Sequence, residues 1–212
     1  MNPVTPTKRP MRLRITPRRA LAAAILVPTL TFAVSRDARE GVAGLVAPEA
    51  EAATAVRLRV DISQRKLSVV RDGDVSRTYS VAVGTKSYPT PRGTFTIRKI
   101  VWNPGWVPPD SDWARDKSPK GPGDDDNPMR VAKIFFREPD YYIHGTPHVS
   151  SLGSAASHGC LRMSPNSVAE LAHQVMNAGG VARDWSWVKS TLRLGKTRTV
   201  HLKRPVTITV TS

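Results

Sequence analysis

Residues 157–163 read Ser-His-Gly-Cys-Leu-Arg-Met and contain Cys160, the only cysteine in the 212-residue chain. A single cysteine cannot form an internal disulfide, and glycine and histidine neighbours are not typical of a structural cysteine in an apolar core. A nearby imidazole can take the proton of a thiol and stabilise the thiolate, which is the nucleophilic form. This stretch therefore predicts a nucleophilic Cys160, and an inert buried thiol is the alternative.

A second motif, Tyr-Tyr-Ile-His-Gly-Thr at residues 141–146, lies upstream of this cysteine. His144, at the end of a predicted strand, can present its side chain to the loop of Cys160, so we expect it to be the general base. His158 is the rival base, although its place in a turn favours shaping the loop. The backbone N–H groups of His158, Gly159 and Cys160 are the predicted oxyanion donors, since glycine lets the backbone turn inward without a Cβ clash.

From Ala55 onward, apolar and polar residues alternate with the period of two that is typical of half-buried strands. Asp72-Gly73 lies between two such runs and favours a hairpin. Residues 166–176 have apolar side chains at helical spacing, follow a proline and end before Gly179. The pattern predicts a mostly β domain, a sandwich or barrel, with one helix after the cysteine loop. The predicted strands are residues 56–62, 67–70, 75–83, 94–101, 132–137, 141–144 and 199–210, the last in two pieces around Pro205.

The first 52 residues differ in character from the rest of the chain. Six basic residues precede an apolar run from Ala20 to Val34, which is the order of an export signal. The run is shorter than the roughly 20 residues that cross a bilayer, which favours a cleaved signal over an uncleaved membrane anchor. We therefore expect residues 1–52 to be an export signal and linker, and the protein to be periplasmic or associated with the cell wall.

The formal net charge of +15 at pH 7 indicates an anionic partner or a solvated basic surface. Residues 53–212 hold 24 basic and 13 acidic residues, so 24 minus 13 leaves +11 on that part. The cations are scattered and no nucleic-acid motif interleaves them with aromatic residues, which argues against a nucleic-acid partner. An exported chain of this charge would instead be attracted to an anionic cell envelope.

Three motifs together resemble the L,D-transpeptidase (YkuD-type) family of peptidoglycan enzymes, over roughly residues 55 to 178. They are Thr-Pro-Arg-Gly-Thr-Phe at 90–95, His-Gly-Thr at 144–146 and the cysteine motif at 157–163. The resemblance implies that residues 53–212 are the catalytic domain, with Cys160 as nucleophile, His144 as base and the carbonyl of Gly145 orienting the imidazole. It implies peptidoglycan stem peptides as substrates, carbapenem-type β-lactams as inhibitors, and no cofactor. The positions expected to contact substrate are Arg162, Ser157, Thr146 and Tyr142.

Several alternatives stay open at this point. Water in place of an acceptor amine would make the enzyme an L,D-carboxypeptidase or a hydrolase, and a non-catalytic, basic wall-binding module is a rival from another class. Arg162 could form an ion pair that steadies the cysteine loop. After Gly180 the resemblance weakens, and Trp185 and Trp187 there could form a lid. The spacing of the histidines and Cys160 matches no common zinc site, so no metal is expected, and we expect a monomer.

Overall fold

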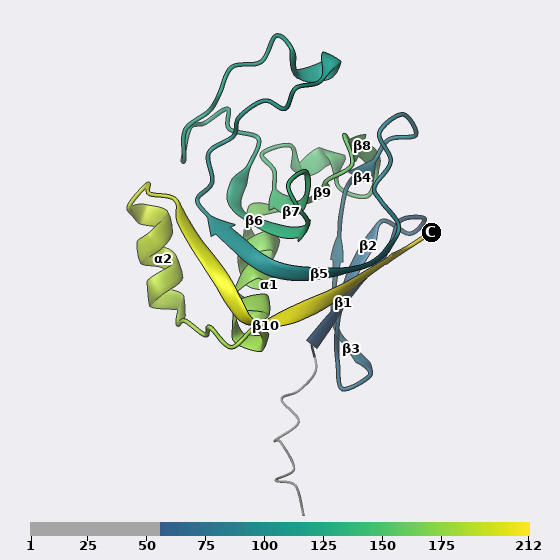
Figure 1. The fold of residues 1–212 in the computed structure, drawn as a ribbon, viewed down its shortest axis with the longest axis vertical. Coiled ribbons are helices and arrows are strands. Elements are labelled where there is room, and N and C mark those ends of the chain that lie inside the picture. The colour runs from purple at the N-terminus through teal and green to yellow at the C-terminus, as the bar shows by residue number, and fades with distance from the viewer. Residues whose placement is uncertain (1–55) are drawn as a thin grey trace, which may run out of the picture. The chain divides into compact units, whose positions relative to one another are not determined.

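The computed structural model describes residues 56–212 (Figure 1). The predicted export signal and the predicted boundary at residue 53 lie outside these residues. None of the helices in the described part is long and apolar enough to cross a membrane. The described strands are β1 Val56–Asp61, β2 Lys66–Arg71, β3 Asp74–Ser80, β4 Val83–Gly84, β5 Gly93–Trp102, β6 Arg130–Arg137, β7 Tyr141–Gly145, β8 Ala155–Ser157, β9 Leu161–Met163 and β10 Arg198–Thr211. The helices are the 3-10 turns η1 Asp112–Ala114 and η2 Val149–Ser151, and the α-helices α1 Pro165–Ala178 and α2 Trp185–Arg193.

Eight of the strands form one sheet, in the order β3-β2-β1-β10-β5-β6-β7-β9, and β4 pairs with β8 in a small second sheet. Most neighbours are antiparallel, but β1–β10 and β7–β9 are parallel. The chain that leaves the edge strand β3 reaches β9 at the opposite edge, where the backbones of Ala82 and Arg162 exchange two hydrogen bonds. The sheet is therefore nearly closed, and the mostly β prediction is confirmed.

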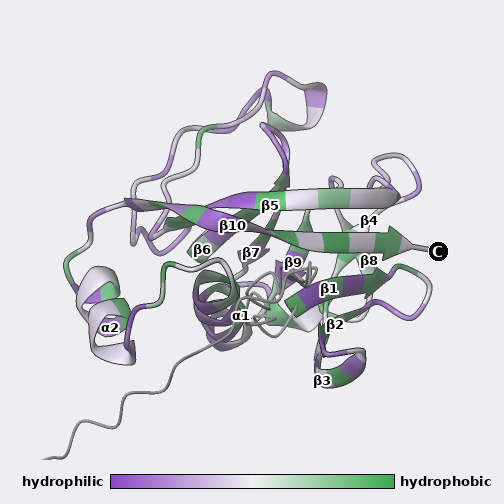
Figure 2. Cartoon of the chain, turned by 60° about the horizontal axis from the view of Figure 1, so that its bottom comes forward, coloured by the Kyte–Doolittle hydropathy of each residue, from purple (hydrophilic) through white to green (hydrophobic). Residues whose placement is uncertain are grey.

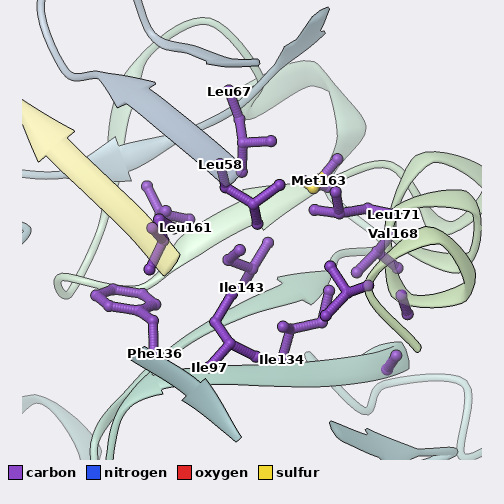
Figure 3. Packing of buried hydrophobic residues seen from close by; sticks show 14 of the residues in the cluster. Leu58, Leu67, Ile97, Ile134, Phe136, Ile143, Leu161, Met163, Val168 and Leu171 are labelled. Atoms are coloured by element: carbon purple, nitrogen blue, oxygen red, sulfur yellow. The ribbon is translucent and has the colours of Figure 1, made fainter. Parts of the chain in front are cut away.

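The core lies between the inner face of this sheet and α1. Hydropathy alternates along β1, β5 and β10 (Figure 2), because successive side chains of a strand point to opposite faces. Burial of each large apolar side chain stabilises the fold by about 1.5–3 kcal/mol. The residues that meet there include Leu58, Ile97, Ile134, Ile143, Leu161, Val168 and Leu171 (Figure 3).

Helix α1 follows the cysteine loop, as predicted. Ser164 caps its first turn, since its hydroxyl accepts a hydrogen bond from the N–H of Ser167 at 3.1 Å, and Pro165 occupies the first helical position. The helix packs against β6 and β7, so it supports the strands that carry the predicted base.

The structure differs from the prediction in several details. The short strands β8 and β9 were not predicted, and the predicted strand 75–83 is divided into β3 and β4. Helix α2 was not predicted; it begins after Asp184, whose carboxylate accepts from the N–H of Trp187 at 2.8 Å. The last strand, β10, is one element and not two, because Pro205 is accommodated by a shift of register between His201 and Val206. A bulge lets a strand pass a residue that cannot donate to its neighbour.

Candidate active site

The predicted base lies at the centre of three adjoining strands. The register of the sheet pairs His144 of β7 with Lys133 of β6 on one side and with Arg162 of β9 on the other. Residues directly opposite each other in a sheet project from the same face. Ile143, the neighbour of His144, is buried in the core, so these three side chains project from the face that α1 does not cover.

A cleft of about 1100 Å³ lies on this face. Its floor includes Lys133, His144, Cys160 and Arg162, and its walls come from the long loop between β5 and β6, which projects at the top of Figure 1, and from residues around β7 and β8. Cys160 precedes Arg162 by two positions in the chain. The predicted nucleophile and the predicted base therefore share one cleft.

The turn that carries the cysteine is held by the hydroxyl of Ser157. That hydroxyl donates to the carbonyl oxygen of Cys160 at 2.5 Å and accepts from the N–H of Gly159 at 3.1 Å. Gly159 has φ +106°, and a Cβ there would lie 2.8 Å from the ring of Tyr141. Only glycine fits this conformation and this space without a shift of its neighbours.

The thiol of Cys160 is half-buried and donates a hydrogen bond to the carbonyl oxygen of Asp140 at 3.2 Å. Burial raises the pKa of this thiol to about 11, an effect that hydrogen bonds from Tyr142 and the positive charge of Lys133 offset only in part. Cys160 is thus a neutral thiol at pH 7, and a base must take its proton before or during attack.

The imidazole of His144 is buried, with 3% of its surface exposed. Its Nδ1 lies 2.9 Å from the carbonyl oxygen of Gly145; because a carbonyl only accepts, Nδ1 carries the hydrogen and Nε2 the lone pair. Burial lowers the pKa of His144 to about 3, and the charges of Arg162 and Lys133 add to that effect. His144 is therefore neutral and oriented, as a general base must be.

Gly145 has a second role in the packing of this strand. A Cβ at this position would lie 2.3 Å from the carbonyl oxygen of Arg130 and 2.9 Å from a methyl group of Val168. Glycine thus allows β7 to lie close to both β6 and α1, and this close packing helps to position the neighbouring His144.

His158 is enclosed by aromatic rings. The indole of Trp113 lies parallel to its imidazole, with centroids 3.9 Å apart and 8° between the planes, and the ring of Tyr88 meets it edge-on at 4.8 Å. Burial lowers the pKa of His158, and the charge of Arg162 lowers it further. These contacts connect His158 to two loops of the cleft wall, which favours His144 over His158 as the base.

One of the predicted oxyanion donors needs correction. The N–H of Gly159 is not free for an oxyanion, because it donates to the hydroxyl of Ser157. Within residues 56–212, the N–H groups of His158 and Cys160 have no protein acceptor. These two remain candidate oxyanion donors, and Gly159 shapes the turn.

The four positions predicted to contact substrate all line the cleft. Two of their hydroxyls are engaged in local structure: that of Ser157 in the cysteine turn, and that of Thr146 as acceptor of the N–H of His148 at 3.1 Å. Burial raises the pKa of the Tyr142 hydroxyl. The guanidinium of Arg162 forms no ion pair with the described residues, so the ion pair weighed as its alternative role is absent there.

The sequence did not single out Lys133, which lines the cleft. Trp185 and Trp187, in contrast, do not line the cleft: Trp185 stacks on His173 of α1 with centroids 4.4 Å apart, and Trp187 packs edge-on against Trp102 at 6.1 Å. The idea that they form a lid is wrong. In the described part of the chain, no three His, Cys, Asp or Glu side chains gather as a metal site would require.

Comparisons with known proteins place the chain in a family. Residues 55–208 match the model of the YkuD family, described as the L,D-transpeptidase catalytic domain. Over 126 residues, 59% of the chain, it is 32% identical to the YkuD protein of Bacillus licheniformis, to which L,D-transpeptidase activity is provisionally ascribed. The chain covers 64% of that relative, which is less than two thirds of its length.

The solved structures that are similar to this chain include two L,D-transpeptidases from mycobacteria. One is an L,D-transpeptidase from Mycobacterium smegmatis, with a TM-score of 0.45, 25% identity, and coverage of 75% of this chain and 59% of the other. The second is L,D-transpeptidase 3 from Mycobacterium tuberculosis with a faropenem-derived adduct, with a TM-score of 0.45, 18% identity, and coverage of 75% and 61%. The YkuD family model matches residues 55–208, which is well over half of the chain. The chain therefore belongs to the YkuD family of L,D-transpeptidase catalytic domains.

Proposed function

We propose that this protein is an L,D-transpeptidase that crosslinks peptidoglycan stem peptides through a thioester on Cys160. The observation that carries the proposal is the placement of Cys160 and a neutral, oriented His144 in one cleft. A thiol and a base in a shared cleft are the minimum machinery for acyl transfer. Family membership supports peptidoglycan stem peptides as the substrate class, and we take the donor to be a stem tetrapeptide that ends in D-alanine.

The first half-reaction acylates the enzyme. The thiol turns from the carbonyl of Asp140 toward Nε2 of His144, which takes its proton while the sulfur attacks the carbonyl carbon of the third stem residue. The N–H groups of His158 and Cys160 receive the oxyanion. The C–N bond then breaks, the protonated Nε2 gives its proton to the leaving amine, and D-alanine departs.

The second half-reaction transfers the acyl group. An amine of a neighbouring stem peptide attacks the thioester, His144 takes a proton from that amine, and the Cys160 thiolate leaves and is reprotonated. Water in place of the amine would give a carboxypeptidase.

Incubation with purified tetrapeptide stems, followed by intact-mass analysis of the protein and chromatography of the peptides, tests this function. We expect an acyl adduct on Cys160, release of D-alanine and a crosslinked dimer, all of which Cys160→Ala should abolish while the fold is retained. A dimer-free reaction that yields only tripeptide would establish the carboxypeptidase instead. Absence of both adduct and products would refute the enzymatic proposal.

We also propose that the protein is exported and acts at the cell envelope. The basic and apolar order of residues 1–34 supports export, and the charge of +11 on residues 53–212 supports attraction to an anionic wall. Fractionation of cells should place the protein outside the cytoplasm. Its adsorption to isolated sacculi should weaken as salt rises, since salt screens exposed charge.

A further inference from the structure

Lys133 is a cation for which the proposed reaction has no evident use. It is half-buried on the cleft floor, and its ammonium makes one hydrogen bond, to the carbonyl oxygen of Gly105 at 3.2 Å. It lies 4.9 Å from the centroid of the Tyr142 ring. A lysine ammonium has three donors, so Lys133 retains hydrogen-bonding capacity toward the cleft.

No carboxylate of the described residues pairs with Lys133 or with Arg162. Burial of an unpaired charge costs free energy unless an opposite charge compensates it. Lys133 and Arg162 flank His144 on the two neighbouring strands, and both interact electrostatically with Cys160. An anion that enters the cleft beside the reacting thiol would therefore meet two uncompensated cations.

Lys99 provides a contrast on the same sheet. Its ammonium lies 4.3 Å from the ring centroid of Phe135, much as Lys133 lies beside Tyr142. Lys99, however, pairs with the carboxylate of Glu138 and does not line the cleft. Of these two lysines above aromatic rings, the one in the cleft is the one without a protein anion.

We propose that Lys133, together with Arg162, binds the terminal carboxylate of the residue that leaves the donor stem. This rests on the proposed function, in which the leaving residue is D-alanine. Its carboxylate carbon is three bonds from the attacked carbonyl carbon, so the anion must lie close to Cys160 during attack. Cross-strand neighbours have Cβ atoms about 5 Å apart, which places the Lys133 side chain within reach of that position. The subsite selects donors with a free carboxylate on the leaving residue.

A simpler role for Lys133 would be to lower the pKa of the thiol without contact with substrate. Two small alkylating agents separate the roles, because iodoacetate and iodoacetamide both lose iodide to the thiolate and differ in carrying a carboxylate or a neutral amide. The measured quantity is the ratio of their rates on Cys160, divided by the same ratio for N-acetylcysteine amide. An effect on thiol pKa changes both rates equally and leaves this ratio unchanged.

The proposal predicts that the wild-type ratio exceeds that of the free thiol. Lys133→Met should lower it by about tenfold, which corresponds to about 1.4 kcal/mol, whereas Lys133→Arg should retain most of it and Lys99→Met should not change it. Circular dichroism and thermal unfolding check that each variant is folded. An equal loss of both rates in Lys133→Met, with the ratio unchanged, would overturn the subsite.

Donor peptides test the same subsite independently of alkylation. The wild-type protein should process a tetrapeptide with a free terminal carboxylate faster than its carboxamide, and Lys133→Met should abolish most of that preference, mainly through KM. If no peptide is turned over but the alkylation ratio responds to Lys133→Met, the transpeptidase function fails and the anion site stands. If turnover is normal and neither preference responds, the subsite fails and the function stands.

Discussion

The indole of Trp113 lies flat against the imidazole of His158, with centroids 3.9 Å apart and 8° between the ring planes. Trp113 comes from the long loop between β5 and β6, whereas His158 is two residues from the nucleophile. Trp106, from the same loop, stacks in turn on Trp113, with 6.5 Å between the two ring centroids. A column of rings thus joins the cleft wall to the cysteine turn.

Removal of Trp113 should loosen that wall. A stacked aromatic pair contributes about 0.5–1.5 kcal/mol beyond burial, so we expect Trp113→Ala to raise KM for the donor by several-fold and to change kcat less. Trp113→Phe should retain most of the stack and most of the affinity. Steady-state kinetics on tetrapeptide stems measures both. A Trp113→Ala variant with wild-type KM would show that the stack does not shape the cleft.

His144 and His158 should respond differently to substitution. His144→Ala removes the base and should lower kcat for acylation by about a hundredfold to ten-thousandfold. His158→Ala leaves the base in place and should cost less, through a looser cysteine turn. Rates of adduct formation by mass spectrometry, on variants shown to be folded, give the comparison. The reverse order of effects would make His158 the base.

A carbapenem should acylate the protein once, on Cys160. Its strained amide presents a carbonyl to the thiol in the place of the donor carbonyl, and the resulting thioester is expected to hydrolyse slowly. Peptide mapping after incubation locates the adduct, and Cys160→Ser is the control. Iodoacetamide labelling of Cys160 without carbapenem labelling would indicate a reactive thiol that lacks an acyl-transfer site.

The sequence predicted those parts of the molecule that are determined by the pattern of neighbouring residues. Alternation of apolar residues located most strands, and the proline and glycines around 165–180 located α1. Helix α2 was missed because it is only nine residues long and its apolar stripe of Trp187, Val188 and Leu192 is short, although Asp184 is a typical N-cap residue.

Long-range relationships could not be predicted in the same way. Lys133 alternates with apolar neighbours in its strand as a solvated lysine would, and the role that we propose for it arises from the register that places it beside His144. The engagement of the Gly159 N–H by Ser157 depends on the local shape of the turn. Neither the register of Lys133 nor the hydrogen bond of the Gly159 N–H can be predicted from residue spacing.

The rate of Cys160 alkylation should depend on pH as expected for a thiol that is neutral at pH 7. The reactive fraction is the thiolate, and burial raises the pKa of Cys160 to about 11. The rate with iodoacetamide should therefore rise about tenfold per pH unit from pH 7 to 10, whereas a free cysteine, with a pKa near 8.5, levels off above about pH 9. A plateau below pH 7 would instead show a thiolate–imidazolium pair in the resting protein.

Stability at mildly acidic pH should reflect the buried, neutral His144. Its pKa is lowered from 6.5 to about 3 in the folded protein, so between these values the unfolded chain binds a proton that the native protein does not. The free energy of unfolding should then fall by up to about 1.4 kcal/mol for each unit that the pH drops below 6.5.

His144→Gln should remove this contribution, and the smaller one from His158 should remain. Urea unfolding at pH 6.5, 6.0 and 5.5, above the range where most carboxylates titrate, measures the slope for both proteins. Equal slopes would mean that His144 is protonated as readily in the fold as in the unfolded chain, which would contradict its burial as a neutral base.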